Sequence, residues 1–289
     1  MSSERPQPRW IAFAFALNVA LAVAHVVVFG LTKSRLVLAQ GADSLMDVAA
    51  VAVLAVSAQV ARRPRDEDHP FGHGRAEPIG ALLVAAFAGV LAFEVGRSAI
   101  AALLGHDDAS IDASVAGVLA LKLGVKTLFV VVLARRARAS RSPALSAVVV
   151  DARNDLAVTG SSLVGYAAAR YGFARADAIL ALPICMYIAY NGLSLARENI
   201  RYLMGASPGA EVVEVIRASA AGVEGVLSVP GVEAHFVGSE IHVEVTVVVS
   251  ASATATEGHD VAVAVQRAVE ANDMVARAFV HVDTDAAER

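Results

Sequence analysis

Six long apolar runs constrain this chain more than any other feature of its sequence. They lie at residues 10–31, 36–60, 79–104, 113–133, 144–169 and 176–195. Each run is close to the roughly 20 residues that a helix needs to cross the hydrocarbon core of a bilayer. A backbone in lipid must satisfy its hydrogen bonds internally, so such runs fold as helices. The sequence therefore predicts an α-helical integral membrane protein with six transmembrane helices.

The loops between these predicted spans differ in charge. The turn at 106–112 contains three aspartates and no Lys or Arg, whereas the loops after the second and fourth spans are rich in arginine: Arg62, Arg63, Arg65, Arg75, Arg135, Arg136, Arg138 and Arg141. Positively charged loops stay preferentially in the cytoplasm. We therefore expect a multi-pass protein of the cell inner membrane with both termini in the cytoplasm.

The character of the sequence changes at Ser207, where Pro208 and Gly209 open a more polar segment. Helical periodicity at 211–221 and 256–271, alternation at 241–247 and a short apolar run at 278–282 predict two helices and two strands. The residues at 222–231, with Pro230, are predicted to form a loop. We expect a transmembrane domain at 1–206 and a small α+β cytoplasmic domain at 207–289.

Composition excludes several classes of protein. Hydrophobic residues make up 56% of the 289 residues, so we expect a lipid membrane as a partner. The formal net charge is -4 and the sequence has no broad basic patch, so we expect no nucleic acid as a partner. The only cysteine is Cys185, which excludes a disulfide framework and a cysteine-based zinc site. A metal site must then use His, Asp or Glu, and we expect no organic cofactor.

Two predicted spans carry pairs of acids: Asp43 with Asp47, and Asp151 with Asp155. A spacing of four residues places both carboxylates on one face of a helix. A single pair on a soluble helix is usually a solvated face, but lipid removes that alternative, so the acids are expected to face the bundle interior. Four converging carboxylates hold either a divalent cation or protons.

The loop between the second and third spans is rich in possible ligands. Asp66, His69 and His73 lie within the sequence DEDHPFGHGRAE, whose glycines permit a tight turn. Histidine and carboxylate suit a borderline metal such as zinc. The alternative is an ordinary charged cytoplasmic loop.

The ADSLMD span, the HPFGHGRAE loop, the DARND span and the small C-terminal domain together resemble the cation diffusion facilitator family, over essentially the whole chain. The resemblance is to the bacterial zinc, iron and manganese efflux type. It implies a homodimeric exporter that exchanges divalent metal ions for protons. It also implies that Asp43, Asp47, Asp151 and Asp155 form the transport site, and that Asp66, His69 and His73 form a loop site.

The same resemblance implies a metallochaperone-like, ferredoxin-like C-terminal domain that dimerises and binds metal between subunits, where the metal also acts as a regulator. The matching positions are His242, His259, His281 and Asp283, with His235 as a further candidate. The alternative is that His242 shares a solvated strand face with Glu244 and Thr246.

Two positions depart from the pattern of the family. The zinc and iron branch commonly has histidine where Asp151 stands, and an all-oxygen site suits harder ions such as Mn²⁺. The family also often has an acid at the position of Gly205, which pairs with the basic residue at Arg75. Gly205 cannot form that pair, so the charge interlock at the dimer contact is not expected here.

Other polar side chains fall within the predicted spans. Glu94 and Arg97 are about one helical turn apart and are expected to pair. Lys122 and Lys126 either extend toward the membrane surface or meet an acid. His25 is expected to pack or to hydrogen-bond rather than to bind metal, and Asn18 and Asn154 are expected to hydrogen-bond between helices.

The function predicted from the sequence is export of a divalent transition metal, Zn²⁺, Fe²⁺ or Mn²⁺, from the cytoplasm in exchange for protons. One alternative is an intramembrane aspartyl protease, although neither acid pair has the GxGD pattern of that class. A second alternative is a metal-sensing membrane scaffold without transport, which requires only the cytoplasmic histidines.

Overall fold

The computed structural model describes residues 8–32, 35–105, 113–140, 142–173, 175–238 and 240–285. The chain forms two compact units, a helical unit that ends at Ile200 and a C-terminal unit that begins at Arg201. Each unit is described by itself.

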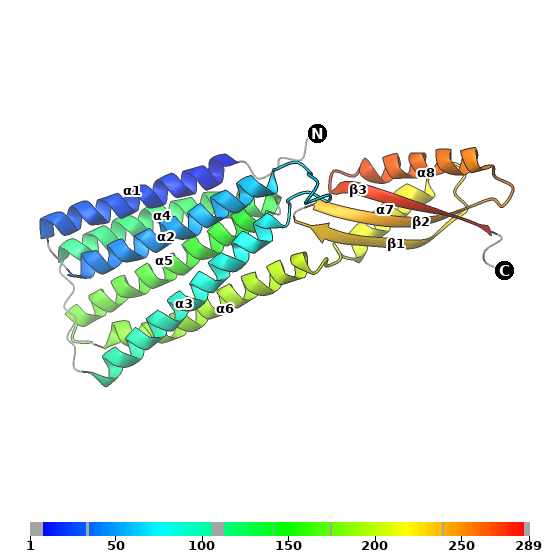
Figure 1. Cartoon of the computed structure of the whole chain (residues 1–289). Helices are drawn as coiled ribbons and strands as arrows, with labels where there is room; N and C mark the ends of the chain where they lie inside the picture. The colour runs from blue at the N-terminus through cyan, green and yellow to red at the C-terminus, as the bar shows by residue number, and fades with distance from the viewer. Residues whose placement is uncertain are drawn as a thin grey trace. The chain divides into compact units, whose positions relative to one another are not determined.

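The described residues of the helical unit form six helices of 25 to 29 residues, as predicted (Figure 1). They are α1 (Pro8–Thr32), α2 (Arg35–Ala61), α3 (Ala76–Leu104), α4 (Ala113–Ser140), α5 (Pro143–Arg170) and α6 (Ala176–Leu203). At about 1.5 Å per residue each helix is long enough to cross a bilayer. Among the described residues, four helices are also apolar enough by composition: α1, α2, α3 and α6.

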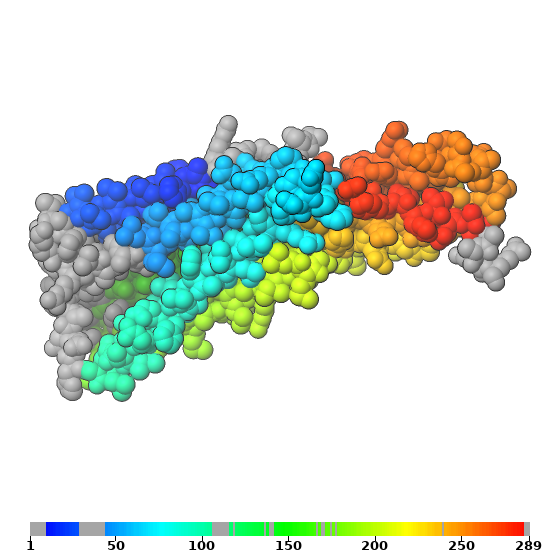
Figure 2. All heavy atoms as spheres, viewed as in Figure 1, coloured from blue at the N-terminus to red at the C-terminus, as the bar shows by residue number. Residues whose placement is uncertain are grey.

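Small residues bring several of these helices into close contact. A side chain added at Gly80 of α3 would lie 2.2 Å from the Ser57 hydroxyl of α2, and one added at Gly192 of α6 would lie 3.1 Å from Ala88. Such contacts are typical of membrane bundles, in which backbones approach closely. On the face seen in Figure 2, α2 lies beside α1, and it also contacts α3.

Many large apolar side chains lie on the outside of the bundle. Large side chains such as Phe93, Leu128 and Met186 are about 70% exposed. Polar and charged side chains from α1, α2, α4 and α5 are instead buried between the helices. This inverted distribution matches a bundle whose solvent is lipid.

The C-terminal unit contains α7 (Ala210–Ala221), β1 (Ser228–Val237), β2 (Glu240–Val249), α8 (Ala255–Glu270) and β3 (Val275–Thr284). The sheet order is β1-β2-β3, with β1 antiparallel and β3 parallel to β2. Alternate β2 residues, including Val243 and Val245, pack with Ile216 of α7 and Val265 of α8 in one core. The predicted α+β class is confirmed.

Two details of the predicted C-terminal domain were wrong. The loop predicted at 222–231 ends earlier, because β1 begins at Ser228 and takes in Pro230 through an irregularity in the register between Ser228 and Gly231. Proline is tolerated at such an irregularity because it needs no ladder hydrogen bond there. The last strand begins at Val275, three residues before the predicted start.

Candidate metal centre

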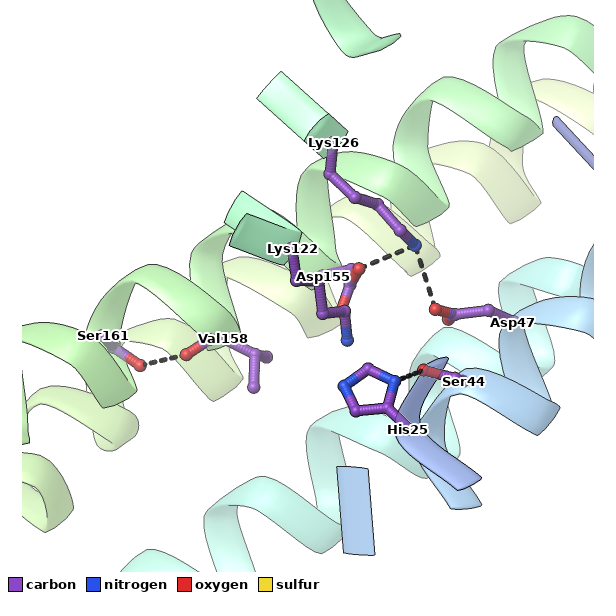
Figure 3. A network of polar contacts seen from close by, with 8 residues as sticks. All are labelled: His25, Ser44, Asp47, Lys122, Lys126, Asp155, Val158 and Ser161. Carbon is purple, nitrogen blue, oxygen red and sulfur yellow. Dashed lines mark hydrogen bonds and ion pairs between the residues drawn. The ribbon is translucent and has the colours of Figure 1, made fainter. Parts of the chain in front are cut away.

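The bundle interior contains a network of buried charges contributed by α2, α4 and α5 (Figure 3). The Lys126 ammonium nitrogen lies 2.9 Å from Asp47 Oδ2 and 2.7 Å from Asp155 Oδ2. The Lys122 nitrogen lies 2.7 Å from Asp155 Oδ1. Asp47 and Asp155, which belong to different predicted acid pairs, therefore meet at a shared cation.

Helical spacing explains the local arrangement of this network. Lys122 and Lys126 are four residues apart on α4, so both point to the same side of that helix. The two lysines are only 1% and 2% exposed, while Asp47 and Asp155 are 9% and 5% exposed. Charges this deeply buried require partners of opposite sign, which these four residues supply to one another.

The structure brings together half of the predicted quartet. Asp151 lies one turn before Asp155 on α5, is half-buried, and is close enough for its charge to act on Lys126. Asp43 lies one turn before Asp47 on α2, but its side chain is outside the described residues. Participation of Asp43 and Asp151 in one site remains a prediction.

Sequence reasoning left the role of the lysines open, and the structure decides it. Lys122 and Lys126 meet acids and do not extend to the membrane surface. The sequence feature that could have indicated this role is the four-residue spacing of the two lysines within a predicted span, because each acid pair has the same spacing. What the sequence lacked was the packing of α4 against α5.

Hydrogen bonds between helices surround the network. His25 of α1 is buried and lies 3.0 Å, Nδ1 to Oγ, from Ser44 of α2. Asn191 of α6 donates to the Asn154 oxygen of α5 at 2.8 Å. The predictions that His25 packs or hydrogen-bonds and that Asn154 bonds between helices are confirmed, as is the pairing of Glu94 with Arg97 on α3. These contacts align α1, α2, α5 and α6 around the charged centre.

A second cluster lies in the loop between α2 and α3. One ligand atom from each of Asp66, His69 and His73 falls within 4.8 Å of the others. Gly72 makes this possible with a φ of 84°, a conformation that side chains disfavour, as its N–H donates to the His69 carbonyl. The predicted loop residues are therefore brought together.

The protonation of the loop cluster suits a metal. His73 Nδ1 donates to the Pro64 carbonyl at 3.2 Å, which leaves Nε2 as its ligand atom, 3.4 Å from Asp66. Desolvation opposes a lower pKa for Asp66, but hydrogen bonds from the His69 backbone and ring and the charges of His73 and His69 hold that pKa below its ordinary value. Asp66 is therefore a carboxylate at neutral pH, and three ligands leave one tetrahedral position for a fourth.

The predicted ligands of the C-terminal unit are not gathered in one chain. The loop cluster is the one group of three or more possible ligands that the described part of the chain contains. His259 is exposed on α8, and His281 is exposed on β3, where it contacts Asp283 at 3.2 Å. His242 is only 2% exposed on β2, beside His235 in the sheet register, so the alternative of a solvated strand face does not hold for His242. Alternation predicted which face His242 occupies but not whether that face is covered.

Gly205 has a backbone reason to be glycine. Helix α6 ends at Leu203, and Gly205 follows with a φ of 72°. The N–H of Ala206 then donates to the carbonyl of Arg201 and closes the helix end. A residue with a side chain would be strained in this left-handed conformation.

Comparison with known families decides what kind of protein carries these sites. Residues 11–204 match the family described as the cation efflux transmembrane domain, and residues 208–285 match the cation efflux protein, cytoplasmic domain. The chain belongs to the cation efflux family. The resemblance to cation diffusion facilitators is thereby confirmed. A cation efflux protein of this kind is a multi-pass membrane transporter and not an enzyme, which removes the intramembrane protease from consideration.

Individual proteins are similar to this chain over most of their length. An uncharacterised transporter of Methanocaldococcus jannaschii is 32% identical over 92% of this chain and 94% of its own. The manganese efflux system protein MneS of Bacillus subtilis is 26% identical over 93% of both chains. The cation-efflux pump FieF of Salmonella arizonae is 31% identical over 70% of this chain and 68% of its own.

Proposed function

We propose that this chain exports a divalent transition-metal cation, Zn²⁺, Fe²⁺ or Mn²⁺, from the cytoplasm in exchange for protons. The observation that carries the proposal is the meeting of Asp47 and Asp155, from α2 and α5, at one buried cationic nitrogen. Carboxylates that hold an ammonium in the bundle interior can also hold a metal ion there. Asp43 and Asp151, one turn away on the same helices, complete the proposed ligand set.

The chemistry of these ligands bears on the choice of ion. Four carboxylates offer oxygen alone, which suits Mn²⁺ better than a set containing imidazole would, although Zn²⁺ also accepts carboxylate oxygen. The similarity to a manganese efflux protein agrees with this preference. Among the three ions, Mn²⁺ is therefore the first to test.

Proton coupling follows from competition for the same oxygens. Metal binding requires deprotonated carboxylates, so the ion binds at the cytoplasmic side when the aspartates are ionised. Exposure of the same residues to a more acidic compartment protonates them and releases the ion. No separate proton site is required by this scheme.

The remaining candidates take supporting roles in the proposal. Asp66, His69 and His73 lie in an arginine-rich loop, and they would capture the ion on the cytoplasmic side. The match of residues 208–285 to the family's cytoplasmic domain supports a homodimer. His242, His259, His281 and Asp283 would then bind metal between subunits, and the exposure of His259 and His281 on the surface of the chain is compatible with this role.

Transport by purified protein in liposomes tests this proposal directly. An imposed pH gradient should drive Mn²⁺ uptake in wild-type vesicles, with accompanying proton movement reported by a pH-sensitive dye. Asp47→Ala and Asp155→Ala should abolish both signals while the protein stays in the membrane. Wild-type rates in both variants would show that these acids are not the transport site, and metal binding without transport by the wild type would favour the sensing scaffold.

A further inference from the structure

Lys126 occupies the position between the two carboxylates at which an ion would bind. Its nitrogen is within 2.9 Å of Asp47 Oδ2 and 2.7 Å of Asp155 Oδ2, and Lys122 takes the other Asp155 oxygen at 2.7 Å. These are the distances of charge-assisted hydrogen bonds. Both oxygens of Asp155 are thus in contact with ammonium groups.

These lysines are more than incidental packing. A lysine on a membrane helix can usually extend its flexible stem toward the headgroups and keep its charge in water. Lys122 and Lys126 are instead 1% and 2% exposed, and Figure 3 shows both side chains converging on Asp155. The structure therefore places two fixed cations in a carboxylate site whose proposed cargo is also a cation.

The lysine and the ion cannot share this position. A metal ion binds carboxylate oxygen at about 2.0–2.2 Å. An ion bridging Asp47 Oδ2 and Asp155 Oδ2 would therefore lie in the volume that the Lys126 nitrogen occupies. Two cations a few ångströms apart in a medium of low dielectric constant also repel strongly. Bridging by the metal requires the ammonium to move away.

We propose that Lys126 is a tethered counter-cation of the transport site, assisted by Lys122. Together with the Lys122 ammonium, it neutralises Asp47 and Asp155 when the site is empty, and it competes with the ion for the same oxygens. Metal affinity is therefore held low enough for the ion to leave. This inference rests on the proposed function, because it concerns the same site.

Charge-removing substitutions test the competition. The full chain carrying His69→Ala and His73→Ala, which removes the loop cluster, is purified in detergent and titrated with Mn²⁺ by calorimetry. Lys126→Gln should bind Mn²⁺ at least about tenfold more tightly, corresponding to loss of one competing charged contact. Lys122→Gln should gain less, because the Lys122 ammonium pairs with Asp155 Oδ1, whereas the Lys126 ammonium lies between Asp47 Oδ2 and Asp155 Oδ2, where the ion would bridge. In liposomes, Lys126→Gln should lower both KM and kcat, since a tighter site releases its ion more slowly.

A matched control removes a cation that lies away from the site. Arg97 of α3 is paired with Glu94 on the exposed side of the helix, so Arg97→Gln should leave the Mn²⁺ affinity unchanged. Unchanged or weaker binding by folded Lys126→Gln overturns the inference. Equal gains in Lys126→Gln and Lys122→Gln also overturn it, since they would reflect net charge rather than competition for one position.

A second variant covers failure of the first to fold. Lys126→Arg keeps the charge and adds a planar fork that holds carboxylates more firmly. It should weaken Mn²⁺ binding, and an unchanged affinity would contradict competition. Transport at the wild-type rate by Asp155→Ala would remove the proposed function itself, so the two failures are distinguishable.

Discussion

Asp155→Asn should be among the most destabilising substitutions in the bundle. Asp155 forms ion pairs with Lys122 and Lys126 at 2.7 Å each, and all three side chains are nearly inaccessible. The substitution removes one negative charge and leaves both ammoniums buried, with Asp47 still beside Lys126. Breaking a buried ion pair by removing one partner costs about 3–5 kcal/mol. At about 2–4 °C per kcal/mol for a chain of this size, the melting temperature should fall by about 6–20 °C.

The assay follows the loss of monodisperse protein on heating in detergent without metal. A double-mutant cycle measures whether the two charges depend on each other, because Asp155→Asn combined with Lys122→Gln removes one charge of each sign. That double variant keeps the neutral pair of Lys126 with Asp47, so it should recover at least half of the lost stability.

The control and the refuting result are both defined by the structure. Glu214→Gln on α7 breaks a surface ion pair with Arg217 and should change stability by less than about 1 kcal/mol. If Asp155→Asn also costs less than about 1 kcal/mol, the buried charges are not mutually dependent in the way that their burial implies. A double variant no more stable than Asp155→Asn alone would likewise contradict the network.

Three further predictions concern other parts of the chain. Asp151→His should shift transport preference toward Zn²⁺ relative to Mn²⁺ in a competition assay, because imidazole suits zinc, and an unchanged ratio would exclude this position from selectivity. His281→Ala should reduce the rise in melting temperature that Zn²⁺ produces in the wild-type protein, and equal rises in the variant and the wild type would argue against metal binding there. Gly205→Ala should cost about 1–2 kcal/mol through its φ of 72°, with Gly222→Ala, at a φ of -75°, as a control lacking that strain. A cost no greater than that of the control would show that the α6 end rearranges freely.

Much of the fold could be predicted because its causes are local. Hydrocarbon thickness sets the length of a spanning helix, so the apolar runs predicted six helices. The ends predicted at 133 and 195 were wrong, because α4 continues to Ser140, through arginines assigned to a loop, and α6 continues to Leu203. Helical periodicity likewise placed Asp47 and Asp155 on the inner faces of their helices. The loop cluster was predictable for the same reason, because Asp66, His69 and His73 are joined by one short turn around Gly72.

Other features depend on which surfaces meet. His242 lies on the predicted face of β2 yet is buried, because alternation sets the direction of a side chain and not what packs against it. The sequence did not predict β1, because Pro230 and Gly231 favour a loop. In the structure, pairing with β2 overrides that local preference.

The charged centre shows most clearly which features follow from sequence periodicity and which depend on tertiary packing. Sequence periodicity was sufficient to pair acid with acid along α2 and α5, and lysine with lysine along α4. The bridge from Lys126 to Asp47 joins residues 79 positions apart, and no periodicity relates them. Only the packing of α4 beside α5 decides that these lysines stay inside the bundle. A lysine side chain is long enough to reach either water or a buried acid. In the folded bundle carboxylates lie within reach of both ammoniums, so the lysines pair with them.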